Sequence, residues 1–177
     1  GEPFLGNGTV TISEIRSTSP SLCAVADSST IHLDRRLAAT DTLESAVREI
    51  EELPSVKKAE AEVVVLDYAM PSWRGVRYPT KKYYPTWSLP ENHPLLDAGV
   101  RTFENLFGEK PEVSRWVFST NGVAIMGMRG IPCIGFGPGN EIYAHMTTEQ
   151  IPIEHLVKAS SWYAAFPLVY LNSNRMK

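Results

Sequence analysis

Apolar and polar side chains alternate along residues 8–16 and again along residues 29–37. This pattern is typical of half-buried β-strands. In the first segment the alternation slips before Ile15, which predicts an irregularity in that strand. Because successive side chains point to opposite faces of a strand, the second segment divides into two faces. One face carries Ile31, Leu33 and Arg35, and the other carries His32, Asp34 and Arg36.

The spacing becomes helical over residues 42–53, where an apolar residue recurs every three or four positions. Asp41 is placed to cap this helix, Glu44 completes a capping-box pattern, and Pro54 is expected to end the helix. A run of β-branched residues over 61–70 predicts a further strand. The N-terminal part is therefore predicted to be strand, strand, helix and strand, with one helix on a small sheet.

Residues 71–94 contain five prolines and five tryptophan or tyrosine residues. The density of prolines excludes a regular helix. The aromatic side chains favour burial over a free linker. We therefore expect a packed segment that joins two units.

The second unit is predicted to contain two helices with two strands between them. The first helix is expected from a cap at Asn92 to a left-handed stop at Gly108. Strands are predicted over 113–118 and 131–136, and a last helix from Pro152. The residues of that helix expected to face inward are Ile153, Leu156, Val157, Ser160 and Tyr163. This order is typical of the end of an α/β layered fold.

Composition narrows the class of protein. The 177 residues are 43% hydrophobic and 21% charged, as in a globular protein of one domain or two small ones. The net charge of −3 disfavours a nucleic-acid binder, and no apolar run approaches the roughly 20 residues of a membrane span. Cys23 and Cys133 form no motif, so we expect free thiols in a reducing, cytoplasmic compartment.

Two loops that follow predicted strands are candidates for chemistry. One is Ser119-Thr120-Asn121-Gly122, and the other runs from Gly137-Pro138-Gly139 to His145. In open α/β sheets, ligands bind just beyond the carboxyl ends of strands, so both loops can border one crevice. An imidazole there can bind a metal or transfer a proton. A simple turn at the glycines and a structural histidine remain open alternatives, as does an anion-binding module.

Several motifs together resemble those of the co-catalytic zinc hydrolases. They are Asp34-Arg35-Arg36-Leu37, Ser119-Thr120-Asn121-Gly122, Gly130-Ile131-Pro132, Gly135-Phe136-Gly137-Pro138-Gly139, and Ala144-His145 with Glu149. That family includes acetylornithine deacetylase, succinyl-diaminopimelate desuccinylase, aminoacylase and carboxypeptidase G. The chain is most similar to its selenium-metabolism-linked hydrolase branch, including at Thr18-Ser19-Pro20-Ser21 and Pro71-Ser72-Trp73.

The resemblance implies an α/β fold in two parts. Residues 1–76 would be the second half of a lid domain that forms a homodimer, and residues 77–177 the C-terminal segment of the catalytic domain. The first catalytic segment, with most metal ligands and the glutamate that acts as general base, would lie outside this chain. As a fragment, the chain alone is then expected to be inactive and to bind zinc poorly.

The resemblance also implies a function and site residues. Two zinc ions, replaceable by cobalt or manganese, would activate a water for cleavage of an amide bond in a small N-acyl amino acid or peptide. His145 would be a metal ligand, and Arg36 would pair with the substrate carboxylate through its bidentate guanidinium. Glu149 has no implied ligand role. The implied substrate-binding residues are Ser119, Thr120, Asn121, Gly137 and Gly139. The main alternative is a non-enzymatic dimerisation module.

Overall fold

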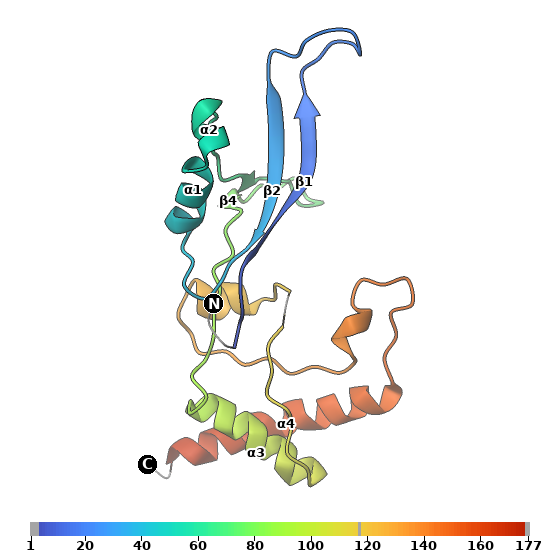
Figure 1. Cartoon of the computed structure of the whole chain (residues 1–177). Coiled ribbons are helices and arrows are strands. Elements are labelled where there is room, and N and C mark those ends of the chain that lie inside the picture. The colour runs from blue at the N-terminus through green and yellow to red at the C-terminus, as the bar shows by residue number, and fades with distance from the viewer. Residues whose placement is uncertain (1–3, 117, 176–177) are drawn as a thin grey trace. The chain divides into compact units, whose positions relative to one another are not determined.

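The computed structural model describes residues 4–116 and 118–175 (Figure 1). The chain forms two compact units, Gly1–Thr86 and Trp87–Lys177. It combines helices with small antiparallel sheets, which confirms the predicted mixed α/β class. Among the described residues, no helix is long and apolar enough to cross a bilayer.

A long β-hairpin dominates the N-terminal unit. Strand β1 (Thr9–Ser17) pairs antiparallel with strand β2 (Ser29–Arg36) (Figure 1). The register shifts between Ile12 and Glu14, which confirms the irregularity that the sequence predicts. Both predicted strands therefore form, because their alternation and the pairing between them agree.

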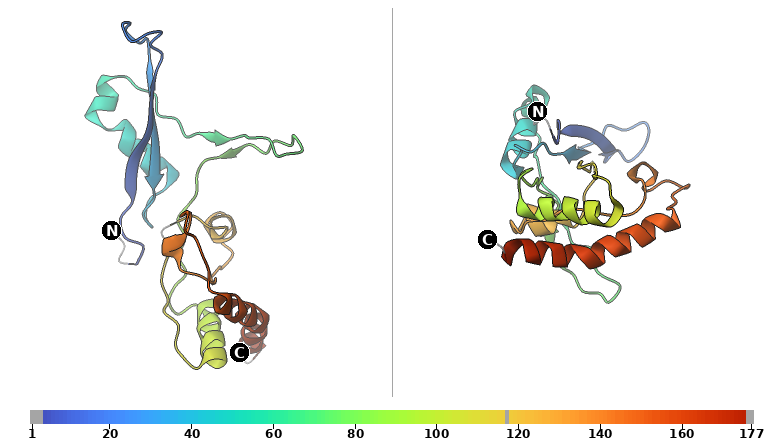
Figure 2. Two further views of the ribbon diagram at one scale, coloured as in Figure 1. Left: turned by 90° about the vertical axis from the view of Figure 1, so that its right-hand side faces the viewer. Right: turned by 90° about the horizontal axis from the view of Figure 1, so that it is seen from below.

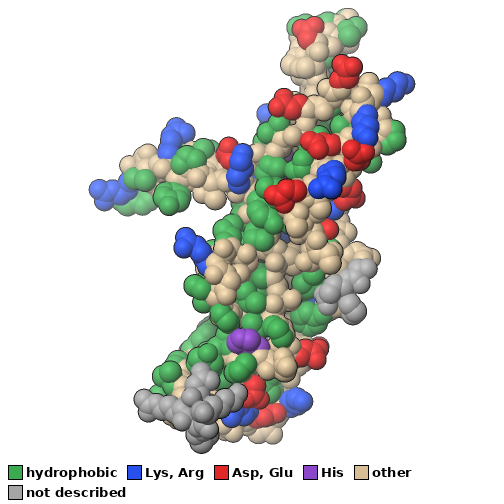
Figure 3. Space-filling view, turned by 90° about the vertical axis from the view of Figure 1, so that its left-hand side faces the viewer, with side chains coloured by type: hydrophobic (Ala, Val, Ile, Leu, Met, Phe, Trp, Pro, Cys, Tyr) green, Lys and Arg blue, Asp and Glu red, His purple; other side chains and the backbone are tan. Residues whose placement is uncertain are grey.

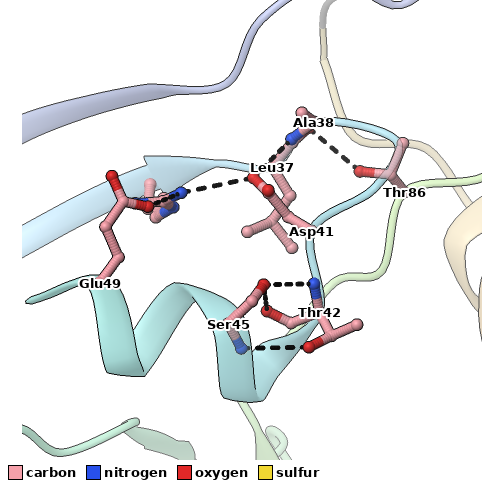
Figure 4. Close-up of polar contacts among 8 residues, drawn as sticks. Leu37, Ala38, Asp41, Thr42, Ser45, Glu49 and Thr86 are labelled. Atoms are coloured by element: carbon pink, nitrogen blue, oxygen red, sulfur yellow. Dashed lines mark hydrogen bonds and ion pairs between the residues drawn. The ribbon is translucent and has the colours of Figure 1, made fainter. Parts of the chain in front are cut away.

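Two short helices follow this hairpin, α1 (Leu43–Glu51) and α2 (Pro54–Lys58). The cap of α1 is Thr42, which forms a reciprocal capping box with Ser45 (Figure 4). The predicted box of Asp41 and Glu44 is wrong. The Asp41 carboxylate instead accepts a hydrogen bond of 2.9 Å from the Ala38 backbone N–H. It also pairs with Arg35.

The predicted strand over 61–70 is only partly present. Strand β3 is limited to Asp67–Tyr68 and pairs with β4 (Thr80–Lys81). Residues 61–66 are not in a strand, so this part of the prediction is wrong. A strand needs a neighbouring strand to complete its hydrogen bonds. Within the described residues, β2 pairs only with β1, so residues 61–66 do not join that sheet.

The C-terminal unit is built on helices α3 (Pro94–Phe107) and α4 (Ile153–Arg175), which pack against each other. The cap of α3 is His93, whose ring accepts a hydrogen bond from the Leu95 N–H, so the prediction of Asn92 is off by one residue. Gly108 ends the helix with a left-handed φ of 74°, as predicted.

Between α3 and α4 the chain forms a π-helix, η1 (Val123–Gly127), and a 3-10 helix, η2 (Glu141–Tyr143). The strands predicted over 113–118 and 131–136 are wrong for every residue that the structure describes, and residue 117 lies outside those residues. Apolar sequence alone does not make a strand where no neighbouring strand supplies a ladder. These segments are held by aromatic packing instead.

The core of the C-terminal unit lies where α3 meets α4. Ala98, Ala159 and Trp162 are the buried hydrophobic side chains among the described residues. The predicted inward face of α4 is wrong, since Ile153 is 78% exposed and Val157 is 61% exposed. Leu156, Ser160 and Tyr163 are exposed too. Helix α4 is apolar on several faces, so periodicity alone does not select the packed one.

Candidate functional site

Phe136 anchors the glycine-rich loop to the helical core. Its ring stacks on Trp162 of α4 with centroids 4.3 Å apart, and it meets Phe103 of α3 edge-on at 6.1 Å. Its backbone carbonyl accepts a hydrogen bond from the Tyr163 hydroxyl. The loop therefore starts from a fixed point on both helices.

The next residues turn sharply and are tied to the start of α4. Gly139 adopts a φ of 99°, a conformation that side-chain-bearing residues rarely accept. Its backbone N–H donates a hydrogen bond of 3.3 Å to Nδ1 of His155. Gly137 lies in open space, with nothing within 4 Å of the position that a Cβ would take. A hydrogen bond thus fixes the turn at Gly139, whereas the space beside the Gly137 backbone is empty.

His145 follows η2 and has a left-handed backbone, with a φ of 64°. Its backbone N–H donates a hydrogen bond of 3.2 Å to Oε2 of Glu149. The side chain of His145 is exposed. A non-glycine residue in this conformation stores strain, which is common at functional positions. Glu149 thus contacts His145 through the backbone N–H.

Ser119, Thr120 and Asn121 lead into the π-helix η1. The hydroxyl oxygen of Thr120 accepts a hydrogen bond of 3.2 Å from the Gly122 N–H. Ser119 and Asn121 are exposed, whereas Thr120 is half-buried. The indole of Trp87 covers Gly122 so closely that a Cβ there would overlap it. π-Helical turns are frequent at functional sites, and this one begins two residues after the predicted substrate loop ends at Asn121.

Arg36, the predicted carboxylate-binding residue, lies on β2 in the N-terminal unit. Its side chain is exposed and its Nε lies 3.5 Å from Oδ1 of Asp34 on the same strand face. The neighbouring Arg35 points to the other face of the strand. Its Nη2 lies 2.5 Å from Oε2 of Glu49 and 3.4 Å from Oδ2 of Asp41. The hydrogen bond to Glu49, more than the attraction of Asp41, raises the pKa of Arg35.

The C-terminal unit holds a cavity that the sequence does not reveal. It has a volume of about 460 Å³ and lies between η2 and the start of α4. Its lining residues are Asn140, Tyr143, Gln150, Ile151, Pro152 and His155. In the sequence, only the glycine turn before Asn140 indicates a crevice here, because folding is needed to bring His155 of α4 close to that turn.

A metal pair is not accommodated by the described residues alone. They contain no group of three or more His, Cys, Asp or Glu side chains placed to hold a metal ion. A catalytic zinc usually takes three protein ligands. His145, Gly137 and Gly139 share one loop system, and Ser119, Thr120 and Asn121 belong to the same unit. Arg36 belongs to the other unit.

The comparisons with known proteins identify the class of this protein. Residues 1–168 match peptidase family M20/M25/M40, and the chain belongs to that family. Two relatives, each called "Uncharacterized protein YgeY", come from Escherichia coli strain K12 and Escherichia coli O157:H7. Each is 52% identical over 170 residues, which is 96% of this chain and 42% of the relative. The chain therefore spans less than half the length of these relatives. The search of solved structures found no significant match.

Proposed function

We propose that this chain is the C-terminal portion of a metal-dependent amidohydrolase or peptidase of the selenium-metabolism-linked branch. The substrate would be a small N-acyl amino acid or a peptide. The observation that carries the proposal is the exposed side chain of His145 beside the glycine turn, in a chain of a peptidase family. The backbone of His145 is left-handed, and its N–H donates a hydrogen bond to the Glu149 carboxylate.

His145 is proposed as a metal ligand that acts together with residues outside this chain. Two zinc ions are the proposed metals, with cobalt or manganese as substitutes. One imidazole falls short of the three ligands that a catalytic zinc needs. The isolated 177-residue chain would therefore bind zinc weakly and would not hydrolyse amides.

Arg36 is proposed to bind the substrate carboxylate. Its guanidinium is exposed on the outer face of β2, and its contact with Asp34 at 3.5 Å is long enough to be exchanged for a ligand. Ser119, Thr120, Asn121, Gly137 and Gly139 are proposed to border the substrate. Open space beside Gly137 would let a ligand approach the backbone.

The N-terminal unit is proposed to form a homodimer, in the cytoplasm. Within the described residues, the sheet of β1 and β2 has two strands, and Val10, Ile12 and Ile31 are about half exposed, at 47%, 57% and 54%. Exposed apolar faces of this kind are usually covered in the working protein. A sheet with open edges can also pair with another copy.

Zinc binding tests the proposed metal role. In a longer protein that contains this chain and the remaining ligands, His145→Ala should remove about one zinc equivalent and lower kcat/KM by about 100-fold or more. For the zinc content, the matched control is His155→Ala, which should keep the full zinc equivalent because His155 is not a proposed ligand. Unchanged zinc content in His145→Ala would refute the ligand role. Tight zinc binding by the isolated chain would refute the incomplete site.

A further inference from the structure

One hydrogen bond closes the loop that carries His145. The Gly139 backbone N–H donates to Nδ1 of His155 at 3.3 Å, between residues that are 16 positions apart in the chain. His155 lies in the first turn of α4, which packs beside α3 (Figure 2). We call this contact the closing bond. It ties the glycine turn to the helical core of the C-terminal unit.

Short-range hydrogen bonds shape the loop of residues 140–154. Oδ1 of Asn140 accepts a hydrogen bond of 3.1 Å from the Ile142 N–H at the start of η2. The loop leaves apolar surface in water, since Ile142 is 66% exposed and Met146 is 51% exposed. Hydrophobic side chains are also open to solvent on the face of the molecule drawn in Figure 3. Segments with few buried apolar contacts open at a low free-energy cost, so losing one hydrogen bond at the base of this loop is expected to change how often it opens.

The closing bond requires an unprotonated Nδ1. A backbone N–H can only donate, so the ring nitrogen that it contacts must accept. A neutral imidazole accepts at Nδ1 when its proton is on Nε2, whereas an imidazolium donates from both nitrogens. Protonation of His155 would therefore bring two donors face to face. The closing bond exists only while the ring of His155 is neutral.

The groups around the ring of His155 favour different charge states. Its Nε2 lies 4.0 Å from Oε1 of Glu154, which favours an imidazolium. The ring also lies in the first turn of α4, where the helix dipole disfavours a cation. Lys158, further along α4, has its ammonium 5.7 Å from the centre of the Phe107 ring. Among the residues that line the cavity beside His155, Tyr143 is the other titratable one, and a phenol is uncharged in acid. Glu154 therefore competes with Gly139 for the ring.

We propose that His155 is a proton-sensitive positioning residue for the glycine turn and for the loop that carries His145. While the ring is neutral, the closing bond holds Gly139 at its φ of 99°. When Nδ1 takes up a proton from solvent, the Gly139 N–H loses its acceptor, and a glycine can readily leave this conformation. The imidazolium is then stabilised by Glu154. An effect on hydrolysis rests on the proposed function, because the turn borders the proposed substrate site, whereas the release of Gly139 does not.

Two substitutions separate the closing bond from the rest of the side chain. In His155→Asn the side-chain oxygen lies the same number of bonds from Cα as Nδ1, so it can accept from Gly139, and it does not titrate. In His155→Gln the oxygen lies one bond further out, in the place of Nε2. The asparagine variant should therefore keep the closing bond at every pH, and the glutamine variant should lack it at every pH.

NMR of the 177-residue chain tests the inference between about pH 8 and about pH 5, where imidazoles titrate. The exchange protection of the Gly139 amide, corrected for the intrinsic effect of pH, should fall about fivefold in the parent chain as the His155 ring resonances titrate. His155→Asn should keep the high protection throughout, and His155→Gln the low protection.

The parent chain alone can decide the matter if a variant fails to fold. Protection and chemical shift of the Gly139 amide that do not follow the titration of His155 would overturn the proposal. The same pH dependence in His155→Asn as in the parent chain would overturn it too. Neither measurement uses zinc or substrate, so the zinc content of His145→Ala tests the proposed function independently.

Discussion

The indole N–H of Trp162 donates a hydrogen bond of 3.1 Å to the backbone carbonyl oxygen of Gly99. The contact joins the middle of α4 to the middle of α3, and the same indole stacks on Phe136 at 4.3 Å. A Cβ at Gly99 would lie only 2.8 Å from Cδ1 of Ile134, so the absence of a side chain at Gly99 allows Ile134 to pack closely against α3. The glycine-rich loop thus takes its position from the contact between the two helices.

Trp162→Phe should destabilise the C-terminal unit by about 2 kcal/mol, because it removes a buried hydrogen bond and part of a packed ring. Hydrogen exchange of the α3 and α4 amides measures this loss. Tyr163→Phe is the control, because this substitution removes only a hydroxyl group from a side chain that is 52% exposed. Equal exchange protection in Trp162→Phe and the parent chain would show that the contact contributes little.

Arg35 and Arg36 are neighbours with different expected roles. Arg35→Ala should destabilise the N-terminal unit by about 1–2 kcal/mol, because Asp41 and Glu49 lose a cation whose side chain is only 18% exposed. Arg36→Ala should change stability by less than about 0.5 kcal/mol, because its ion pair is exposed. Thermal unfolding of both variants measures the difference. The reverse order of stability would contradict these placements.

Gly122→Ala should destabilise the loop around η1, because the indole of Trp87 occupies the space that a Cβ needs. We expect a loss of about 1–3 kcal/mol, typical of overpacking. Amide exchange across 119–130 measures the effect. Gly137→Ala is the matched control, since nothing lies within 4 Å of its Cβ position. If both substitutions had equal effects on exchange, the packing of Trp87 on Gly122 would be refuted.

The stability of α1 should depend on acid pH through Glu44. Its carboxylate accepts hydrogen bonds from its own backbone N–H and from the Thr42 hydroxyl, which lower the pKa of Glu44 below its usual 4.5. The folded pKa is below the unfolded one, so the stabilisation is present above the unfolded pKa and is lost as pH falls through the folded pKa. An NMR titration of the Glu44 carboxyl should show the lowered pKa.

Thr42→Ala provides the control for this titration. Removal of the hydroxyl should move the pKa of Glu44 back toward its usual value and should cost about 1 kcal/mol of helix stability. The capping box of Thr42 and Ser45 would be lost at the same time. A pKa of Glu44 that does not change in Thr42→Ala would show that the hydroxyl is not a partner of the carboxylate.

The sequence predicted those elements whose stabilising contacts are local. The alternation in β1 and β2, with its slip before Ile15, and the left-handed stop at Gly108 depend on neighbouring residues. The motifs that resemble those of zinc hydrolases likewise single out His145 and the glycine turn by residue type and order alone, and the family match supports that resemblance. The roles assigned to those site residues remain predictions.

Tertiary structure decided the features that depend on residues far apart in the chain. Residues 61–66 form no strand, because an extended segment needs a hydrogen-bonding neighbour. Trp162 marks the packed side of α4, since only folding brings Gly99 and Phe136 to that side. Short-range periodicity specifies which elements a segment prefers, but the partner that supplies the missing hydrogen bonds or contacts determines which preference is realised.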